Sequence, residues 1–174
     1  MTLTTGYIQI YTGNGKGKTT AALGLALRAA GAGLRVFIAQ FIKSGDYSEI
    51  QALANHTNHI RVEQFGLGRF IKGKPTAEDV AAAREGLASV REALVGGACD
   101  VVIMDEGNVA AMVGLFSPDD LLALMEIKPE GVELVITGRG ADQRVIARAD
   151  LVTEMKAVKH YYEAGVAARV GIEK

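Results

Sequence analysis

The residues best suited to chemistry in this sequence are a lysine and a threonine at the end of a glycine-rich run. The run reads Thr12-Gly13-Asn14-Gly15-Lys16-Gly17-Lys18-Thr19-Thr20. Glycines let backbone N–H groups approach phosphate oxygens without a Cβ in the way, and a helix that starts there adds unpaired N–H donors. Lys18 supplies a full positive charge, and the Thr19 hydroxyl can ligand Mg²⁺. The run therefore predicts a phosphate-binding loop for a nucleoside triphosphate.

The segments on either side of this loop support that interpretation. Residues 7–11 are apolar and β-prone, and residues 18–32 read as a helix. Strand, glycine loop and helix together form the P-loop arrangement. The usual pattern G-x-x-x-x-G-K-[ST] places its first glycine where Thr12 stands, so the glycine comes one residue late here. The alternative, a chance match by a Gly- and Lys-rich turn, would not account for the flanking strand and helix.

A second motif places paired acids at the end of an apolar segment. Residues 101–104 are Val-Val-Ile-Met, and Asp105 and Glu106 follow them. An acid at such a strand end lies beside a P-loop and holds Mg²⁺ directly or through water, since Mg²⁺ needs only one or two protein carboxylates. If the strand continues through the pair, the two side chains point to opposite faces, and one of them faces the metal. A solvated acid at a strand end is the alternative.

Two cations also follow predicted strands. Arg139 stands between two glycines after residues 133–137, and its guanidinium can bind phosphate oxygens in a planar, bidentate manner. Lys43 follows residues 35–40 and can face a phosphate or an acidic ligand. The alternative for Arg139 is a surface turn, and the alternative for Lys43 is a plain helix-entry loop.

The elements that must position these residues alternate between strand and helix. Strands are predicted at residues 7–11, 35–40, 60–64, 101–104, 133–137 and 151–154, and helices at residues 18–32, 47–54, 77–95, 118–125 and 143–148. Several strands are nearly continuous apolar runs, as expected for strands covered on both faces. The pattern predicts an α/β fold with a mostly parallel sheet and helices on both faces. Ligands of such sheets lie beyond the carboxyl ends of the strands, where the polar segments fall.

The composition of the 174 residues narrows the class of function. Hydrophobic residues make up 49% and charged residues 22%, and the length suits one domain over residues 1–174. A net charge of −1 gives no basic field for nucleic acid or an anionic membrane. The single cysteine, Cys99, excludes an internal disulfide and a Cys-cluster zinc site. Because no apolar run is long enough to span a membrane and no basic leader begins the chain, we expect a cytoplasmic protein.

Taken together, the motifs resemble those of the P-loop ATP:corrinoid adenosyltransferases, which make adenosylcobalamin and its precursors. The matching stretches are residues 11–22, Gln40-Phe41-Ile42-Lys43, Asp105-Glu106, Ile136-Thr137-Gly138-Arg139-Gly140, Val158-Lys159-His160, Gly165 and Gly171-Ile172-Glu173. They occur in family order over nearly the whole chain, and the shifted first glycine is itself a family trait. The resemblance implies a RecA-like P-loop NTPase fold, usually in a homodimer.

The resemblance also implies the reaction. The 5′-deoxyadenosyl group of ATP passes to the cobalt of a corrinoid, such as cobalamin, cobinamide or cobyrinic acid diamide, and inorganic triphosphate leaves. An electron donor first reduces Co(II) to Co(I), which then attacks C5′ in line. ATP lies in the loop in reverse, with its γ-phosphate end where the α-phosphate normally lies. Because the metal is the nucleophile, no general base is needed, and the sequence shows no convincing His–carboxylate or Ser–His pair.

Family roles carry over to particular residues of this chain. ATP is expected to contact Gly13, Asn14, Gly15, Lys16, Gly17, Lys18, Thr19 and Thr20, together with Arg28 on the following helix. Thr19 and Glu106 are the expected Mg²⁺ ligands. The expected catalytic residues are Lys18, Glu106 and Arg139, because cations and a bound metal stabilise the negative charge that accumulates on the triphosphate leaving group.

The corrinoid site is where this sequence departs from the family pattern. Better-known members carry a Phe-x-Trp pair in the loop after the third strand, whose side chains displace the lower ligand of cobalt and ease reduction of Co(II). This chain has no tryptophan, and its corresponding loop spans residues 65–74. The expected apolar contacts to the corrinoid in this loop are Phe65, Leu67, Phe70 and Ile71.

Two other functions remain open at the level of sequence. A different P-loop enzyme, such as a nucleoside kinase or a small ATPase, would release ADP, and in an ATPase Glu106 would position the attacking water. A thymidine-kinase-like enzyme would usually carry a Cys-rich zinc lobe, which the lone Cys99 does not provide. A non-catalytic module switched by ATP would bind nucleotide without turnover and without affinity for a corrinoid.

Overall fold

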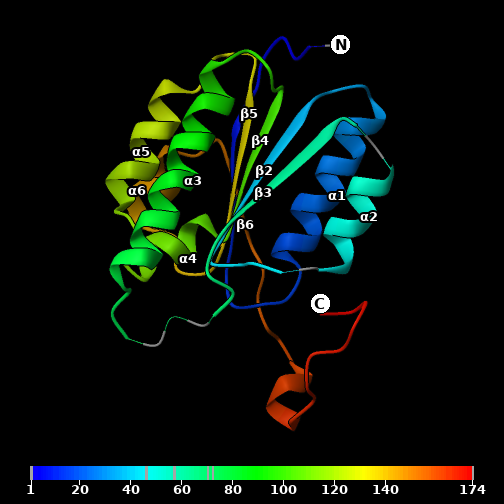
Figure 1. Cartoon of the computed structure of the whole chain (residues 1–174), viewed down its shortest axis with the longest axis vertical. Helices are drawn as coiled ribbons and strands as arrows, with labels where there is room; N and C mark the ends of the chain where they lie inside the picture. Colours follow the sequence, from blue (N-terminus) through cyan, green and yellow to red (C-terminus); the bar gives the residue numbers. More distant parts are fainter. Residues whose placement is uncertain (1, 46, 57, 70, 72, 174) are drawn as a thin grey trace.

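A parallel sheet forms the centre of the protein, as seen in a computed structural model that describes residues 2–173 except 46, 57, 70 and 72, and the side chains of 54–56. The strand order is β3-β2-β4-β5-β1-β6, and every pair of neighbouring strands is parallel (Figure 1). The strands are β1 (Ile8–Thr12), β2 (Val36–Phe41), β3 (Ile60–Phe65), β4 (Val101–Asp105), β5 (Glu133–Thr137) and β6 (Leu151–Glu154). The predicted parallel sheet is thus confirmed.

Helices cover both faces of this sheet (Figure 1). One face carries α1 (Lys18–Gly31) and α2 (Ser48–His56), and the other carries α3 (Ala77–Val95), α4 (Gly107–Met112), α5 (Pro118–Ile127) and α6 (Gln143–Arg148). Each face has its own apolar core, and alternate residues of one strand enter different cores. Along β2, Phe37 and Phe41 join the core under α3, whereas Val36 and Ile38 join the core under α1. Burial on both faces explains why this strand is a continuous apolar run.

The position of β5 in the sheet defines the type of P-loop fold. β5 lies between β1, which precedes the glycine loop, and β4, which ends in Asp105. A strand inserted between these two is the arrangement of a RecA-like P-loop fold, so that expectation is confirmed. All predicted strands and helices are present, with ends that shift by one or two residues. None of the helices in the described ranges is long and apolar enough to cross a membrane.

The chain leaves the sheet after β6 as an extended segment, residues 155–173, called here the C-terminal arm. It contains a short 3₁₀ helix, η1 (Tyr161–Ala164), and then turns back so that its end lies below α1 (Figure 1). Glu173 accepts hydrogen bonds from Arg169 and Tyr161, and these two partners lower the pKa of its carboxyl to about 2. At the same point, Lys16 Nζ donates to the Ile172 carbonyl at 2.7 Å. The Lys16 contact joins the end of the arm to the glycine loop, whereas the bonds of Glu173 to Arg169 and Tyr161 hold the arm to itself.

Candidate active site

The glycine loop between β1 and α1 wraps around the ammonium of a lysine. Gly13 and Gly17 have φ values of 92° and 118°, in the left-handed region that favours glycine, and Gly17 caps α1 so that the helix starts at Lys18. Lys18 Nζ donates to the carbonyls of Gly13 and Gly15, at 2.7 Å each. Burial lowers the pKa of Lys18, and the negative charge of Glu106 opposes that shift. The glycine loop therefore holds the positive charge of Lys18 at its centre.

The start of the C-terminal arm packs against the same loop. The N–H of Gly15 donates to the Met155 carbonyl at 2.7 Å, and the Met155 N–H donates to the Thr12 carbonyl at 2.8 Å. A Cβ built on Gly13 or Gly15 would lie 2.4 or 2.8 Å from the Met155 oxygen. These two glycines are therefore required by contact with the arm. The N–H of Gly15 is thus bonded to Met155 and does not face the phosphate position.

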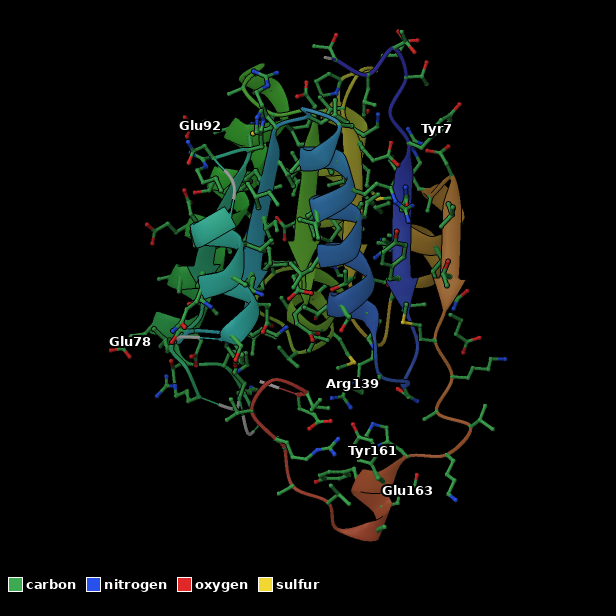
Figure 2. The ribbon with its side chains drawn as sticks, turned by 90° about the vertical axis from the view of Figure 1, so that its right-hand side faces the viewer. Tyr7, Glu78, Glu92, Arg139, Tyr161 and Glu163 are labelled. Carbon is green, nitrogen blue, oxygen red and sulfur yellow. The ribbon has the colours of Figure 1, made fainter. Side chains whose placement is uncertain are left out.

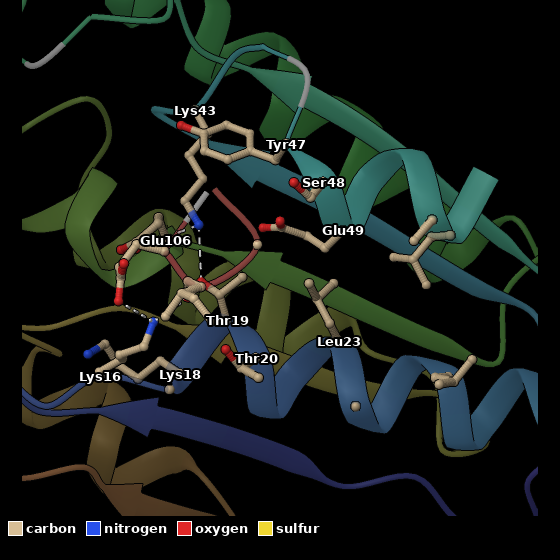
Figure 3. A pocket seen from close by; sticks show the side chains of 18 of the residues that line it. Lys16, Lys18, Thr19, Thr20, Leu23, Lys43, Tyr47, Ser48, Glu49 and Glu106 are labelled. Atoms are coloured by element: carbon tan, nitrogen blue, oxygen red, sulfur yellow. Dashed lines mark hydrogen bonds and ion pairs between the residues drawn. The ribbon is translucent and has the colours of Figure 1, made fainter. Parts of the chain in front are cut away.

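A cavity of about 830 Å³, called here the nucleotide cavity, lies in front of the loop and the first turns of α1 (Figure 3). Of the predicted ATP contacts, residues 15–20 line it, whereas Gly13, Asn14 and Arg28 do not. Arg28 is exposed on another side of α1. Its charge acts on Tyr11 instead, where it opposes the rise in the pKa of Tyr11 that burial causes. The structure therefore brings together the core of the predicted loop but leaves Arg28 away from this cavity.

Asp105, the first of the two predicted acids, is a buried hydrogen-bond acceptor beside this cavity and is 1% exposed. Its Oδ1 accepts bonds of 2.8 Å from the hydroxyls of Thr19 and Thr137. Its Oδ2 accepts bonds from Gln40 Nε2 at 3.2 Å and from Lys43 Nζ at 2.8 Å. The carboxylate thus connects the glycine loop with the carboxyl ends of β2, β4 and β5. Buried carboxylates with this many donors hold their neighbours in fixed positions.

Glu106, the second acid, takes a left-handed conformation with φ of 61° and is the N-cap residue of α4, which starts at Gly107. Because β4 ends at Asp105, the two acids do not follow strand alternation, and both lie near the ammonium of Lys43. The Glu106 N–H donates to Thr137 Oγ1 at 3.0 Å, which fixes the turn. Burial raises the pKa of the Glu106 carboxyl, and the charge of Lys43 opposes that shift. Both acids therefore belong to one site.

The oxygens gathered here suit Mg²⁺. Thr19, Asp105 and Glu106 bring a hydroxyl and two carboxylates, the hard donors that this ion prefers. Within the described ranges, no group of three or more His, Cys, Asp and Glu side chains could hold a metal. Mg²⁺ typically binds through one or two carboxylates together with phosphates and waters, so a smaller set of donors is adequate. The place also accommodates a cation, because the Lys43 ammonium lies among these oxygens.

A second cavity of about 340 Å³, called here the side cavity, adjoins the first. The two cavities share Lys43, Tyr47 and Glu106 as lining residues. The other walls of the side cavity come from the loops after β2 and β3, from α4, and from Arg139. Figure 2 shows Arg139 at the end of the sheet that faces the C-terminal arm. Arg139 therefore lies beside the side cavity and not among the residues that line the nucleotide cavity.

The predicted corrinoid contacts in the loop after β3 have different positions. Ile71 lines the side cavity, and Leu67 is exposed on the same loop. Phe65 is a core residue instead, 8% exposed and with its ring centroid 6.0 Å from that of Phe41. Phe70 lies outside the described residues. The surface that this loop offers to a ligand therefore includes Leu67 and Ile71, while Phe65 supports it from below.

The sequence prediction did not place Tyr47 or the end of the C-terminal arm in the nucleotide cavity. Tyr47, before α2, lines both cavities, and the end of the C-terminal arm, Gly171–Glu173, lines the nucleotide cavity. The arm had one signal, because Gly171-Ile172-Glu173 belongs to the stretches that resemble the family. Tyr47 had none, since an aromatic residue before a helix is common in any fold. Lys43 was noticed as a cation after a strand, but its acidic partners were not.

Comparison with known proteins identifies relatives along nearly the whole chain. Residues 4–173 match the family described as ATP:corrinoid adenosyltransferase BtuR/CobO/CobP. The corrinoid adenosyltransferase of Escherichia coli (strain K12) is 34% identical over 169 residues, which cover 97% of this chain and 85% of that protein. The corrinoid adenosyltransferase of Pseudomonas aeruginosa is 33% identical and covers 97% of this chain and 83% of its own length. Corrinoid adenosyltransferase CobA of Salmonella typhimurium is 33% identical, with coverage of 97% and 85%.

A comparison with solved structures finds more remote likenesses. Domain III of the Thermotoga maritima replication initiation protein DnaA matches with a TM-score of 0.46 and 17% sequence identity. The match covers 87% of this chain, which spans 55% of the DnaA chain. A likeness this remote says nothing about function.

Proposed function

Because the chain belongs to the ATP:corrinoid adenosyltransferase family, we propose that its nucleotide cavity binds Mg²⁺-ATP and that its side cavity receives the corrinoid. The reaction is transfer of the 5′-deoxyadenosyl group of ATP to Co(I) of a corrinoid, with release of inorganic triphosphate. The observation that carries the proposal is the wall shared by both cavities, which consists of Lys43, Tyr47 and Glu106. C5′ of ATP and the cobalt would meet at this wall.

The residues of the glycine loop would bind the triphosphate. Lys18 and Lys16 line the nucleotide cavity, and the N-terminus of α1 opens onto it. A helix N-terminus and fixed ammonium groups stabilise phosphate charge, which grows as the carbon–oxygen bond to the triphosphate breaks. Arg139 lines the side cavity, so it would act on the phosphate next to C5′. That position agrees with a reversed ATP, whose α-phosphate end is turned toward the side cavity.

Thr19 and Glu106 would hold Mg²⁺, and Asp105 would act through Thr19. When bound, Mg²⁺ supplies positive charge to the phosphate oxygens. Asp105 accepts the hydrogen of the Thr19 hydroxyl at 2.8 Å, which leaves the lone pairs of that oxygen available to a metal. Glu106 is partly exposed, with 26% of its side chain accessible, and lines both cavities. The two acids thus take separate roles, one in positioning and the other in direct contact.

The loop after β3 would contact the lower face of the corrinoid. Ile71 lines the side cavity and Leu67 is exposed on the same loop, and Phe70 from the sequence prediction would add to them. An apolar surface there would displace the lower cobalt ligand and ease reduction of Co(II) to Co(I) by a separate electron donor. The side cavity is smaller than a corrinoid, so the rest of the ligand would lie outside it.

A second copy of the chain is the proposed partner in a homodimer. β6 pairs only with β1 in the described sheet, and its Leu151 and Val152 are 45% and 42% exposed. The C-terminal arm adds Val158 and Val170, which are 96% and 78% exposed. An open strand edge beside exposed apolar side chains is the kind of surface that another chain covers. Light scattering after gel filtration would measure the mass of the particle directly.

The division of the site into two cavities can be tested by filling each one. Leu27 lines only the nucleotide cavity, and Val113 lines only the side cavity. We expect Leu27→Phe to raise the KM for ATP severalfold with little change for the corrinoid, and Val113→Phe to do the reverse. If both variants raise the KM of the same substrate, the assignment of the two cavities is wrong.

A further inference from the structure

Lys43 is held at the centre of the site by oxygen atoms of three residues. Its Nζ lies 2.8 Å from Asp105 Oδ2, 3.1 Å from Thr19 Oγ1 and 3.9 Å from Glu106 Oε1. Figure 3 shows its side chain reaching from the end of β2 down to the first turn of α1. Burial would lower the pKa of Lys43, but the nearby carboxylate of Asp105 raises it above the usual value. The lysine is therefore a cation in the position where three oxygen donors converge.

The backbone around Lys43 is strained in a way that directs it to this position. In the described residues, Ile42 and Glu106 are the non-glycine residues with positive φ, at 68° and 61°. Ile42 immediately precedes Lys43, and a β-branched residue in the left-handed region is an outlier that the surroundings must enforce. Gly66, directly after β3, packs closely against this turn, since a Cβ there would lie 2.4 Å from the Ile42 carbonyl carbon. The strain is thus maintained by close packing of two strand ends.

The oxygens around Lys43 are those proposed above for the metal. Mg²⁺ binds oxygen at about 2.1 Å, and an ammonium that is hydrogen-bonded to Asp105 and Thr19 and ion-paired with Glu106 leaves it no room. Two cations that share these ligands would also repel each other strongly at such a short distance. Lys43 in its observed position and a metal bound to Thr19 and Glu106 therefore exclude each other.

We propose that Lys43 occupies the cation position of the active site before ATP binds, and that the incoming Mg²⁺-ATP displaces its ammonium toward the wall of the side cavity. The inference rests on the proposed function and assigns a positioning role to a residue whose role was left open between alternatives in the sequence analysis. The positive charge of Lys43 compensates the negative charges of Asp105 and Glu106, so these acids do not attract a free metal ion. The metal then enters together with the nucleotide, whose phosphates supply the additional ligands.

Displacement would also link the two cavities. Lys43 lines both of them, so an ammonium released from Asp105 remains at the shared wall. Positive charge would then stand next to the place where the triphosphate separates from C5′. Loading of Mg²⁺-ATP would in this way complete the electrostatic surroundings of the reacting carbon, and an enzyme without nucleotide would lack them.

The test measures binding of Mn²⁺ alone, a paramagnetic substitute for Mg²⁺, by electron paramagnetic resonance without nucleotide or corrinoid. We expect the wild-type protein to bind Mn²⁺ weakly and Lys43→Met to bind it at least about tenfold more tightly, because a competing cation has been removed. Lys16→Met is the matched control, since it also removes one positive charge from the nucleotide cavity. In the wild type the Lys16 ammonium bonds to the Ile172 carbonyl and not to the metal-binding oxygens. This control should stay near the wild-type affinity.

Two outcomes would overturn the proposal. Equal Mn²⁺ affinity in Lys43→Met and the wild type would show that Lys43 does not compete for the position. Tight binding of Mn²⁺ to the wild-type protein without nucleotide would show the same. Lys43→Gln retains a hydrogen-bond donor to Asp105, so it supplies the answer if Lys43→Met does not fold. Since the measurement contains no corrinoid, its result is independent of whether adenosyl transfer occurs.

Discussion

The hydroxyl of Thr19 donates a 2.8 Å hydrogen bond to Asp105, although β5 separates the strands that lead to these two residues. The same threonine oxygen accepts a bond from the ammonium of Lys43 at 3.1 Å. A hydroxyl that donates in one direction and accepts from a cation in the other has a fixed orientation. These two bonds orient the Thr19 hydroxyl in the first turn of α1, and they depend on residues that are far apart in the sequence.

The first prediction concerns this hydroxyl. Thr19→Val keeps the shape of the side chain but removes the donor to Asp105 and the oxygen for Mg²⁺, so we expect kcat/KM for ATP to fall by about a hundredfold. Thr20→Val is the matched control, because Thr20 lines the same cavity. Steady-state kinetics at several Mg²⁺ concentrations would measure both. Equal losses in the two variants would contradict a special role for Thr19.

The second prediction concerns the lysine inside the glycine loop. Lys18→Ala should abolish adenosyl transfer because it removes the charge that Gly13 and Gly15 hold at the phosphate position. Circular dichroism and thermal unfolding should show that the fold is retained. Lys16→Ala, at the rim of the same cavity, should retain more activity. A fully active Lys18→Ala enzyme would eliminate the P-loop assignment.

The third prediction tests the packing that aims Lys43. A methyl group on Gly66 would overlap the Ile42 backbone, so Gly66→Ala should destabilise the protein by about 1–3 kcal/mol and slow transfer by moving Lys43. Gly31→Ala is the control, because a Cβ there meets nothing within 4 Å and should be neutral or stabilise α1 by up to about 1 kcal/mol. Urea unfolding would compare them. An unchanged Gly66→Ala protein would refute the close contact.

The fourth prediction concerns pH and stability. Asp100 accepts hydrogen bonds from the backbone and guanidinium of Arg35, and these bonds hold the pKa of its carboxyl below the usual value. A depressed pKa in the folded state adds stability above the unfolded-state pKa of about 3.9, and this stability is lost as the pH falls through the folded-state value. Asp100→Asn should therefore reduce the free energy of unfolding at pH 7 and flatten its dependence on acidic pH.

The control for the pH prediction is a surface acid. Asp119 pairs with Arg144, but its side chain is 73% exposed, and exposed ion pairs contribute little. Asp119→Asn should therefore reproduce the wild-type pH profile of unfolding. If Asp100→Asn does so too, the Arg35 pair does not set the acid sensitivity.

The fifth prediction concerns the apolar contacts to the corrinoid. Ile71→Ala should slow adenosylation of a Co(II) corrinoid with a weak reductant more than adenosylation of pre-reduced Co(I), because it removes part of the surface that displaces the lower ligand. Phe70→Ala should behave alike. Val170→Ala, which truncates an exposed residue of the C-terminal arm, should leave the ratio of the two rates unchanged. Equal slowing of both reactions by Ile71→Ala would remove this residue from the role.

The sequence predicted what local patterns determine. The P-loop could be located because its glycines, lysine and threonine are adjacent, and β2 could be located because burial on both faces makes it apolar throughout. The short helix α4 was missed, since its N-cap residue, Glu106, is in a left-handed conformation that no local signal marks. The partners of Lys43 were missed because they lie 24 and 62 residues away in the sequence and meet only when the strands assemble.

The end of the C-terminal arm shows the same limit more strongly. Ile172 meets Lys16 across 156 residues, and neither residue has a pattern that would specify the other. Phe65 shows the converse, because an aromatic residue at a strand end suits a ligand site and a core equally well in sequence. Packing of Phe65 against Phe41 resolved this choice in favour of the core.

The most direct test of the central claim is an anaerobic single-turnover reaction of the wild-type protein with Mg²⁺-ATP and chemically reduced Co(I) cobalamin. The visible spectrum would follow the light-sensitive cobalt–carbon bond, and phosphorus NMR would identify the phosphate product. We expect one inorganic triphosphate for each adenosylcobalamin formed. Release of ADP or phosphate with an unchanged corrinoid spectrum would contradict it and favour an ATPase or kinase.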